Sequence, residues 1–128
     1  MENKTNMIKT SLSPLMKMDE IQFAYLFGSY AKGDYSQRSD IDIAVYLEKQ
    51  YNNFDTKLKI HHKLEVALRK EIDLIILNSA KNFNLLENIF DDGIVIKDSR
   101  DDSRIMYELD REHEIKDYKE FRKLLHVA

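Results

Sequence analysis

Three aspartates stand at positions where they could meet around a metal ion. Asp40 and Asp42 are one residue apart at the start of a predicted strand, so both carboxylates point to the same face. Asp73 lies near the start of another predicted strand, among apolar neighbours where an uncompensated carboxylate costs free energy. Like charges held close together repel unless a cation bridges them, and carboxylates with phosphate oxygens are the usual ligands of Mg²⁺. If the two strands are neighbours, these residues could bind one or two magnesium ions for a phosphoryl displacement, with Asp73 also accepting the proton of an attacking hydroxyl.

A glycine and a serine come directly after a third predicted strand. Gly28-Ser29 follows Ile21–Phe27, a run rich in aromatic and branched residues. A glycine lets the backbone approach a ligand closely, and successive backbone N–H groups followed by a hydroxyl suit phosphate oxygens. A Gly-Ser pair alone carries little weight as evidence. It gains weight here because the aspartate pair follows after ten intervening residues.

Each of these residues also has a purely structural interpretation. Asp40 could cap a turn, Asp42 could be exposed on an edge strand, and Asp73 could be a solvated carboxylate at a strand end. The combination of all three with Gly28-Ser29, each next to a predicted strand, favours a catalytic site.

The segments that must position these residues alternate between strands and helices. The alternating pattern of Ile41–Leu47 places Asp42, Ala44 and Tyr46 on one face of a strand and Ile41, Ile43 and Val45 on the other. The other predicted elements are a loop at Gly28–Ser39, a helix from Asp55 to Lys70 capped by Asn53 or Asp55, a strand at Ile72–Leu77, a short helix from Asn82 or Asn84 to Phe90, a strand at Ile94–Ile96 and a long helix from Asp101 to Leu125. This order predicts an α+β (α/β) domain with a small mixed sheet flanked by helices.

The long last helix carries a broken apolar stripe. Its members are Ile105, Leu109, Ile115, Tyr118, Phe121 and Leu125. We expect the helix to pack on the domain or to offer part of its length as a docking surface for a partner.

Composition excludes several classes of protein. With 128 residues, we expect one domain, with a core at about residues 8–96 and the last helix at about 101–125. The absence of cysteine excludes disulfides, cysteine-based metal sites and thiol catalysis. A formal net charge of −3 argues against extended binding to nucleic acid. There is no long apolar segment and no secretory signal, so we expect a cytoplasmic protein that does not enter a membrane.

The segment AYLFGSYAKGDYSQRSDIDIAVYLE resembles the signature of the DNA polymerase beta–type nucleotidyltransferase superfamily, and its minimal nucleotidyltransferases in particular. That superfamily combines a hydrophobic strand, Gly-Ser, a spacer of about ten residues, Asp-x-Asp and a later carboxylate on a strand. The resemblance covers roughly residues 8–96 and implies the polymerase beta-like fold.

The resemblance also implies a role for each matching residue. Gly28 and Ser29 would hold the β- and γ-phosphates of a nucleoside triphosphate, and Asp40, Asp42 and Asp73 would bind two Mg²⁺ ions. Within the loop, Lys32 and Arg38 could neutralise the triphosphate, and Ser39 could orient Asp40. The implied reaction is attack of an acceptor hydroxyl on the α-phosphorus, with release of pyrophosphate.

The acceptor is implied only by the resemblance, and no residue of the sequence shows the partner. Minimal nucleotidyltransferases are commonly paired with a helical HEPN protein, and the resemblance implies an antitoxin that transfers AMP from ATP to a tyrosine of a HEPN toxin. Two alternatives stay open: a non-catalytic antitoxin that inhibits by binding, and a nucleotidyltransferase acting on a small molecule such as an aminoglycoside. A homo-oligomer is also possible.

Other residues with chemical potential are assigned structural roles. Tyr30 and Tyr35 could stack on a nucleotide base, but packing within the loop is the preferred interpretation. The four histidines lack the spacing of metal ligands, since adjacent His61 and His62 diverge by about 100° on a helix.

Overall fold

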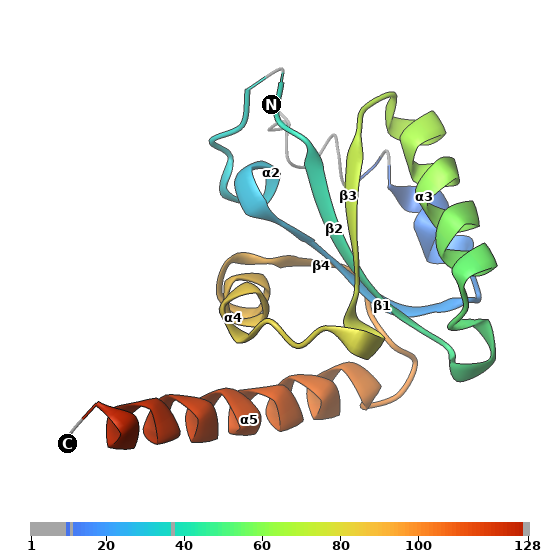
Figure 1. Cartoon of the computed structure of the whole chain (residues 1–128). Helices are drawn as coiled ribbons and strands as arrows, with labels where there is room; N and C mark the ends of the chain where they lie inside the picture. Colours follow the sequence, from blue (N-terminus) through green and yellow to red (C-terminus); the bar gives the residue numbers. More distant parts are fainter. Residues whose placement is uncertain (1–9, 11, 37, 127–128) are drawn as a thin grey trace.

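The computed structural model describes residues 10, 12–36 and 38–126, and its centre is a four-stranded mixed sheet (Figure 1). The strand order is β3-β2-β1-β4, in which β1 is antiparallel to both of its neighbours and β2 is parallel to β3. The strands are β1 (Ile21–Phe27), β2 (Ile41–Leu47), β3 (Ile72–Ile76) and β4 (Ile94–Lys97). The predicted mixed sheet is therefore confirmed, with strand ends within one residue of the predicted ones.

A helix follows each of the four strands. The helices are α2 (Gly28–Lys32), α3 (Phe54–Leu68), α4 (Phe83–Asp92) and α5 (Ser103–Leu125), with short 3-10 turns η1 (Ser13–Lys17), η2 (Lys49–Tyr51) and η3 (Leu77–Ser79). Asn53 caps α3 by accepting a hydrogen bond from the Thr56 N–H at 2.8 Å, and Asn82 caps α4 in the same way. The prediction of a continuous loop at Gly28–Ser39 was wrong for its first five residues, which form α2.

The sheet separates two apolar clusters. One face packs on α3 and η1 through a cluster that includes Ile41, Ile43 and Val45. The other face packs on α4 and α5 and includes Ala44. The predicted alternation along β2 is confirmed, and it places Asp42 on the α4–α5 face of the sheet.

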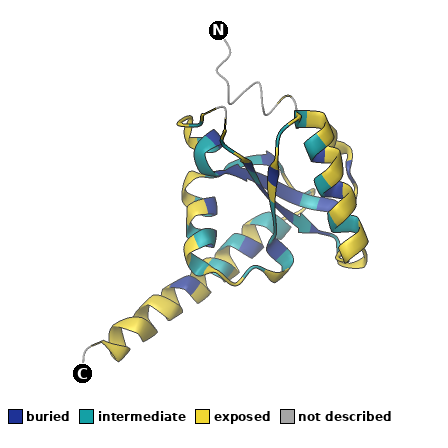
Figure 2. Ribbon diagram, turned by 45° about the horizontal axis from the view of Figure 1, so that its top comes forward, coloured by how far each residue is buried: buried dark blue, intermediate teal, exposed yellow. Residues whose placement is uncertain are grey.

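The first half of α5 is the part that packs on the domain. Tyr107, which the predicted apolar stripe omitted, is buried, and its hydroxyl donates a hydrogen bond to the Leu77 carbonyl at 2.8 Å. Ile115 is also buried, whereas Ile105, Leu109, Tyr118, Phe121 and Leu125 are exposed. Of the predicted apolar stripe, only Ile115 packs into the core. The expectation that the helix packs on the domain therefore holds for its first half, and the distal half extends beyond the domain (Figure 2).

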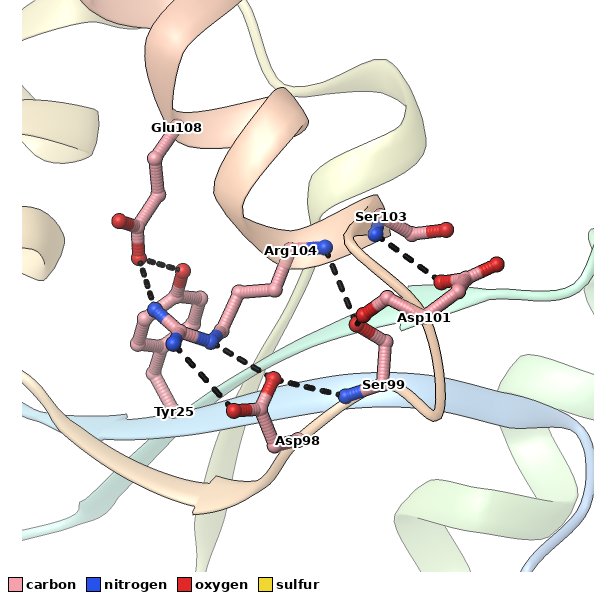
Figure 3. Close-up of polar contacts among 7 residues, drawn as sticks. All are labelled: Tyr25, Asp98, Ser99, Asp101, Ser103, Arg104 and Glu108. Atoms are coloured by element: carbon pink, nitrogen blue, oxygen red, sulfur yellow. Dashed lines mark hydrogen bonds and ion pairs between the residues drawn. The ribbon is translucent and has the colours of Figure 1, made fainter.

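A polar network holds the beginning of α5 against β1 and the segment after β4 (Figure 3). The Arg104 guanidinium donates to both carboxylate oxygens of Asp98, at 2.8 and 3.3 Å, and to Glu108 at 2.9 Å. Glu108 also accepts a hydrogen bond from the Tyr25 hydroxyl on β1.

Among the described residues, no helix is long and apolar enough to cross a membrane.

Candidate functional site

Gly28 is the point at which β1 turns into α2. Its φ of +71° lies in the left-handed region, which disfavours any residue with a Cβ atom. A Cβ atom built there would lie 2.1 Å from the Asp42 Oδ2 atom. The register of the sheet explains this proximity, because Phe27 pairs with Asp42 across β1 and β2. Gly28 therefore brings open backbone directly against the Asp42 carboxylate.

Asp42 and Asp73 are neighbours across two parallel strands. The register pairs Asp42 on β2 directly with Asp73 on β3, so both side chains leave the same face of the sheet. The Asp42 side chain is half-buried, whereas that of Asp73 is exposed. The hypothesis that the third strand would bring Asp73 beside the aspartate pair is confirmed for Asp42.

The position of the Asp42 carboxyl disfavours its charged form. Burial, together with the charge of Asp73, a hydrogen bond with Asp73 and the charge of Asp40, raises the pKa of Asp42 to about 6. Among the described residues, no cation is paired with Asp42. A carboxylate with raised pKa beside like charges is a frequent property of functional sites.

The donor set fits a hard divalent cation. Asp42 and Asp73 offer carboxylate oxygens, which Mg²⁺ prefers, and a cation between them would relieve the repulsion that raises the Asp42 pKa. Asp40 precedes β2 and its side chain is exposed. Among the residues that the structure describes, no three acidic or histidine side chains converge tightly enough to enclose a metal. The structure thus brings Asp42 and Asp73 together and leaves Asp40 at the edge of the pair.

Ser29 is held within the short turn that follows Gly28. Its carbonyl accepts hydrogen bonds from the N–H groups of Gly33 and Asp34, at 2.9 and 3.1 Å. Gly33 ends α2 with a φ of +82°, and a Cβ atom there would meet nothing within 4 Å. The two glycines therefore differ: Gly33 only permits a turn, whereas Gly28 also makes room for Asp42.

In the described part of the following loop, Lys32, Arg38 and Ser39 form polar contacts with residues other than Asp40, Asp42 and Asp73. The Lys32 ammonium forms an exposed ion pair with Asp92 at 3.6 Å, at the end of α4. The Arg38 side chain is exposed, and its N–H donates to the Ser36 hydroxyl at 3.3 Å. The Ser39 hydroxyl accepts a hydrogen bond from the Ser36 N–H at 2.9 Å, which stabilises the turn. Nucleotide binding by Lys32, Arg38 and Ser39 remains a prediction.

An aromatic pair links α2 to the loop that follows it. The rings of Tyr30 and Tyr35 stack at 4.1 Å between centroids with an angle of 14°, and Tyr30 is fully buried. The Lys70 ammonium lies 5.8 Å from the centre of the Tyr30 ring. The preferred interpretation of the two tyrosines as loop packing is confirmed. The sequence analysis missed Lys70, because no motif connects the end of α3 with this loop.

These features define a class of site. A glycine turn at the end of β1 leaves the backbone open to a phosphate group, and carboxylates lie on the strands β2 and β3. The chain matches the family model described as "Polymerase beta, Nucleotidyltransferase" over residues 10–102. The chain belongs to this family, and it is a nucleotidyltransferase. This confirms the resemblance found in the sequence.

Three comparisons place the chain within the family. It is 41% identical over 61 residues to the protein adenylyltransferase MntA of Shewanella oneidensis, over 48% of this chain and 43% of MntA. A crystal structure of a toxin–antitoxin with AMP-PNP contains a chain that superposes with a TM-score of 0.73 at 25% identity, covering 95% of this chain and 94% of that chain. The complex of tri-AMPylated Shewanella oneidensis HEPN toxin with MNT antitoxin shares the fold, with a TM-score of 0.70, 22% identity and 94% coverage of both chains.

Proposed function

We propose that this chain is a protein adenylyltransferase that transfers AMP from ATP to a tyrosine hydroxyl of a HEPN-type toxin and so acts as its antitoxin. The observation that carries the proposal is the Asp42–Asp73 pair beside the open backbone of Gly28. The similarity to MntA of Shewanella oneidensis, a protein adenylyltransferase, supports this reaction. The likeness to a chain of a toxin–antitoxin with AMP-PNP supports an adenine nucleotide substrate and a toxin partner.

Each site residue has a role in this proposal. The ATP phosphates approach the backbone at Gly28, and Ser29 binds the β- and γ-phosphates through its N–H and hydroxyl groups. Asp42 and Asp73 would hold Mg²⁺, and the exposed carboxylate of Asp40 would be available as a further ligand. Bound magnesium supplies positive charge that stabilises the phosphate oxygens during transfer. Arg38 binds the triphosphate from the loop, Lys32 does so after leaving Asp92, and Ser39 holds the loop turn that bears Arg38.

The transfer is a single in-line displacement. The acceptor oxygen forms a bond to the α-phosphorus, the bond from that phosphorus to the bridging oxygen breaks, and pyrophosphate leaves. The hydroxyl proton passes to the Asp73 carboxylate, which lies beside Asp42 and is exposed to an incoming protein. Positioning and electrostatic stabilisation supply the rate enhancement, since no covalent enzyme intermediate forms.

The test uses ATP labelled at the α-phosphate, Mg²⁺, the purified chain and the protein encoded by the adjacent gene. We expect label on the partner protein from α-labelled ATP and none from γ-labelled ATP. Asp42→Asn should abolish labelling, whereas Asp110→Asn, which changes an exposed aspartate on α5, should not.

Two outcomes would replace the proposal. Tight binding of the partner without any transfer of label would establish a non-catalytic antitoxin. Transfer of label to an aminoglycoside or another small hydroxyl compound, and not to the partner, would establish a small-molecule nucleotidyltransferase.

A further inference from the structure

His61 on α3 contacts the backbone of β3 one residue before Asp73. Its Nε2 atom lies 2.8 Å from the Ile72 carbonyl oxygen. A carbonyl only accepts hydrogen bonds, so Nε2 is the donor. The other ring nitrogen, Nδ1, lies 3.4 Å from the Glu65 carboxylate, one helical turn further along α3. The imidazole ring therefore bridges α3 and the beginning of β3.

The Ile72 carbonyl needs a hydrogen-bond donor because of its place in the sheet. β3 is an outer strand, and its strand partner is β2. The Glu71 carbonyl faces β2, where it accepts a hydrogen bond from the Ile41 N–H at 3.1 Å. Successive carbonyls of a strand point in opposite directions, so the Ile72 carbonyl points away from β2. Ile72 is only 6% exposed, and a buried carbonyl without a partner costs free energy, so the His61 donor stabilises this strand edge.

The helix that carries His61 is firmly packed on the sheet. Ile60 and Leu64, which flank His61 in the sequence, are fully buried and belong to the same apolar cluster as Ile72. α3 lies alongside β3 (Figure 1). The hydrogen bond therefore connects the beginning of β3 to a close-packed element that has little freedom to shift.

The hydrogen bond acts on Asp73 through one peptide group. The Ile72 carbonyl and the Asp73 N–H belong to the same planar unit, so fixing the direction of the carbonyl also fixes the Asp73 backbone. Asp73 is the second residue of β3 and lies directly beside Asp42, and their like charges repel. The anchor at Ile72 opposes this repulsion at the end of the strand where it acts.

We propose that His61 is a positioning residue for the metal site, which holds Asp73 through the Ile72 carbonyl beside Asp42, where the two carboxylates can share one divalent cation. His61 comes from α3, which packs on one face of the sheet, whereas the two carboxylates leave the other face. It therefore acts through Asp73 and not as a metal ligand. The inference rests on the proposed function, because it assigns a task to a residue outside the carboxylate pair.

The adjacent histidine provides a matched control, since His62 is exposed on the same helix. Calorimetry measures the binding of AMP-PNP to the purified chain in Mg²⁺ and in EDTA. In Mg²⁺, His61→Leu should raise the dissociation constant about tenfold, as loss of a group that orients a metal ligand does. In EDTA it should have no effect, because only metal-dependent binding involves Asp73. His62→Leu should match the parent chain in both buffers.

A conservative variant separates the hydrogen bond from other roles of the ring. His61→Gln carries an amide nitrogen at the same number of bonds from Cα and should keep most of the Mg²⁺-dependent affinity. His61→Asn, whose amide is one bond shorter, should behave like His61→Leu and replaces it if the leucine variant does not fold. Urea unfolding verifies that each variant is folded.

Two results would overturn the positioning role. The first is a folded His61→Leu or His61→Asn protein with the parent's affinity in Mg²⁺, which would leave His61 as a cap of the strand edge and no more. The second is a parent chain whose AMP-PNP binding does not depend on Mg²⁺. Failure of the proposed function is seen separately, with α-labelled ATP and the protein encoded by the adjacent gene. A parent chain that labels no partner, but whose Mg²⁺-dependent binding weakens in His61→Leu, would refute the antitoxin reaction and support the role of His61.

Discussion

Two polar clusters lie on the α4–α5 side of the sheet, and they handle charge in opposite ways. At the start of β2, Asp42 stands beside Asp73, and burial with the neighbouring negative charges raises the pKa of Asp42 to about 6. Around the start of α5, the Arg104 guanidinium binds Asp98 and Glu108, and its hydrogen bonds hold the pKa of Asp98 below its ordinary value. The first cluster is electrostatically uncompensated, whereas the second is compensated.

The difference in charge compensation suits the first cluster to the proposed binding of a cation and the second to stabilising the fold. Compensated charges lower the free energy of the folded chain, so the Arg104 network anchors α5. Uncompensated carboxylates raise that free energy, and they persist where a bound cation and phosphates complete the site. The two clusters should therefore respond to substitution with opposite signs in stability and with very different effects on activity.

The largest expected effect comes from removing the Asp42 charge. Asp42→Asn should lower nucleotide transfer by at least about 10²-fold, because it removes the proposed metal ligand and the electrostatic stabilisation that depends on it. The same variant should unfold at a higher urea concentration at neutral pH, because the repulsion from Asp73 is gone. Labelling with α-labelled ATP and urea unfolding provide the two readouts. A folded Asp42→Asn protein with near-normal turnover would contradict the metal-binding role of Asp42.

Substitution of Gly28 should have the next largest effect on transfer activity, and its cause is steric and not electrostatic. Gly28→Ala forces a Cβ atom toward the Asp42 carboxylate at a backbone φ of +71°. We expect a loss of about 1–3 kcal/mol in the free energy of unfolding and a loss of transfer activity in the protein that remains folded. Gly33→Ala is the matched control, since Gly33 also has a positive φ but has open space around it. It should lose about 1 kcal/mol of stability and keep most of its activity. Equal effects of the two substitutions would show that backbone strain alone explains Gly28.

Sequence patterns were sufficient to predict the elements and most of the pairing that forms the site. Strand alternation placed Asp42 on the correct face of β2, and the short apolar run around Asp73 marked β3 correctly. The turn at Gly28 was predicted as loop because five residues are too few for helical periodicity to be visible. Tyr107 was missed because its burial depends on β1, η3 and α4, which lie far away in the sequence.

The side-chain contacts of charged residues could not be predicted in the same way. Lys32 pairs with Asp92, 60 positions further along the chain, and Lys70 reaches Tyr30 from the end of α3. A long flexible side chain such as that of lysine can reach several possible partners. A motif specifies the residue type, but it does not specify which partner the side chain contacts. A structure of the nucleotide-bound protein tests the predicted roles of Lys32, Arg38 and Ser39.

Substitution in the compensated cluster should give the reverse of the Asp42 result. Arg104→Met leaves Asp98 and Glu108 without their cation, and we expect a loss of about 2 kcal/mol in the free energy of unfolding. Transfer activity per folded molecule should stay close to normal. Lys59→Met, which breaks an exposed ion pair with Glu20, should cost no more than about 0.5 kcal/mol. If urea unfolding gave the same cost for both variants, the network in Figure 3 would be no stronger than an ordinary surface ion pair.

The smallest effect, and the most direct comparison of the two clusters, is the pH dependence of stability in buffer with EDTA. Asp98 has a lowered pKa in the folded chain, so its contribution is present above the unfolded pKa of about 4 and is lost as the pH falls further. Because its side chain is 56% exposed, Asp98→Asn should destabilise by only a few tenths of a kcal/mol at pH 7. Asp42 has a raised pKa, so its charge is penalised increasingly as the pH rises from about 4 to 6 and fully above that range. Asp42→Asn should therefore match the parent chain below about pH 4 and exceed its stability at pH 7, while Asp98→Asn falls below it at pH 7. Parallel pH profiles for the two variants would show that the two clusters do not differ in charge compensation.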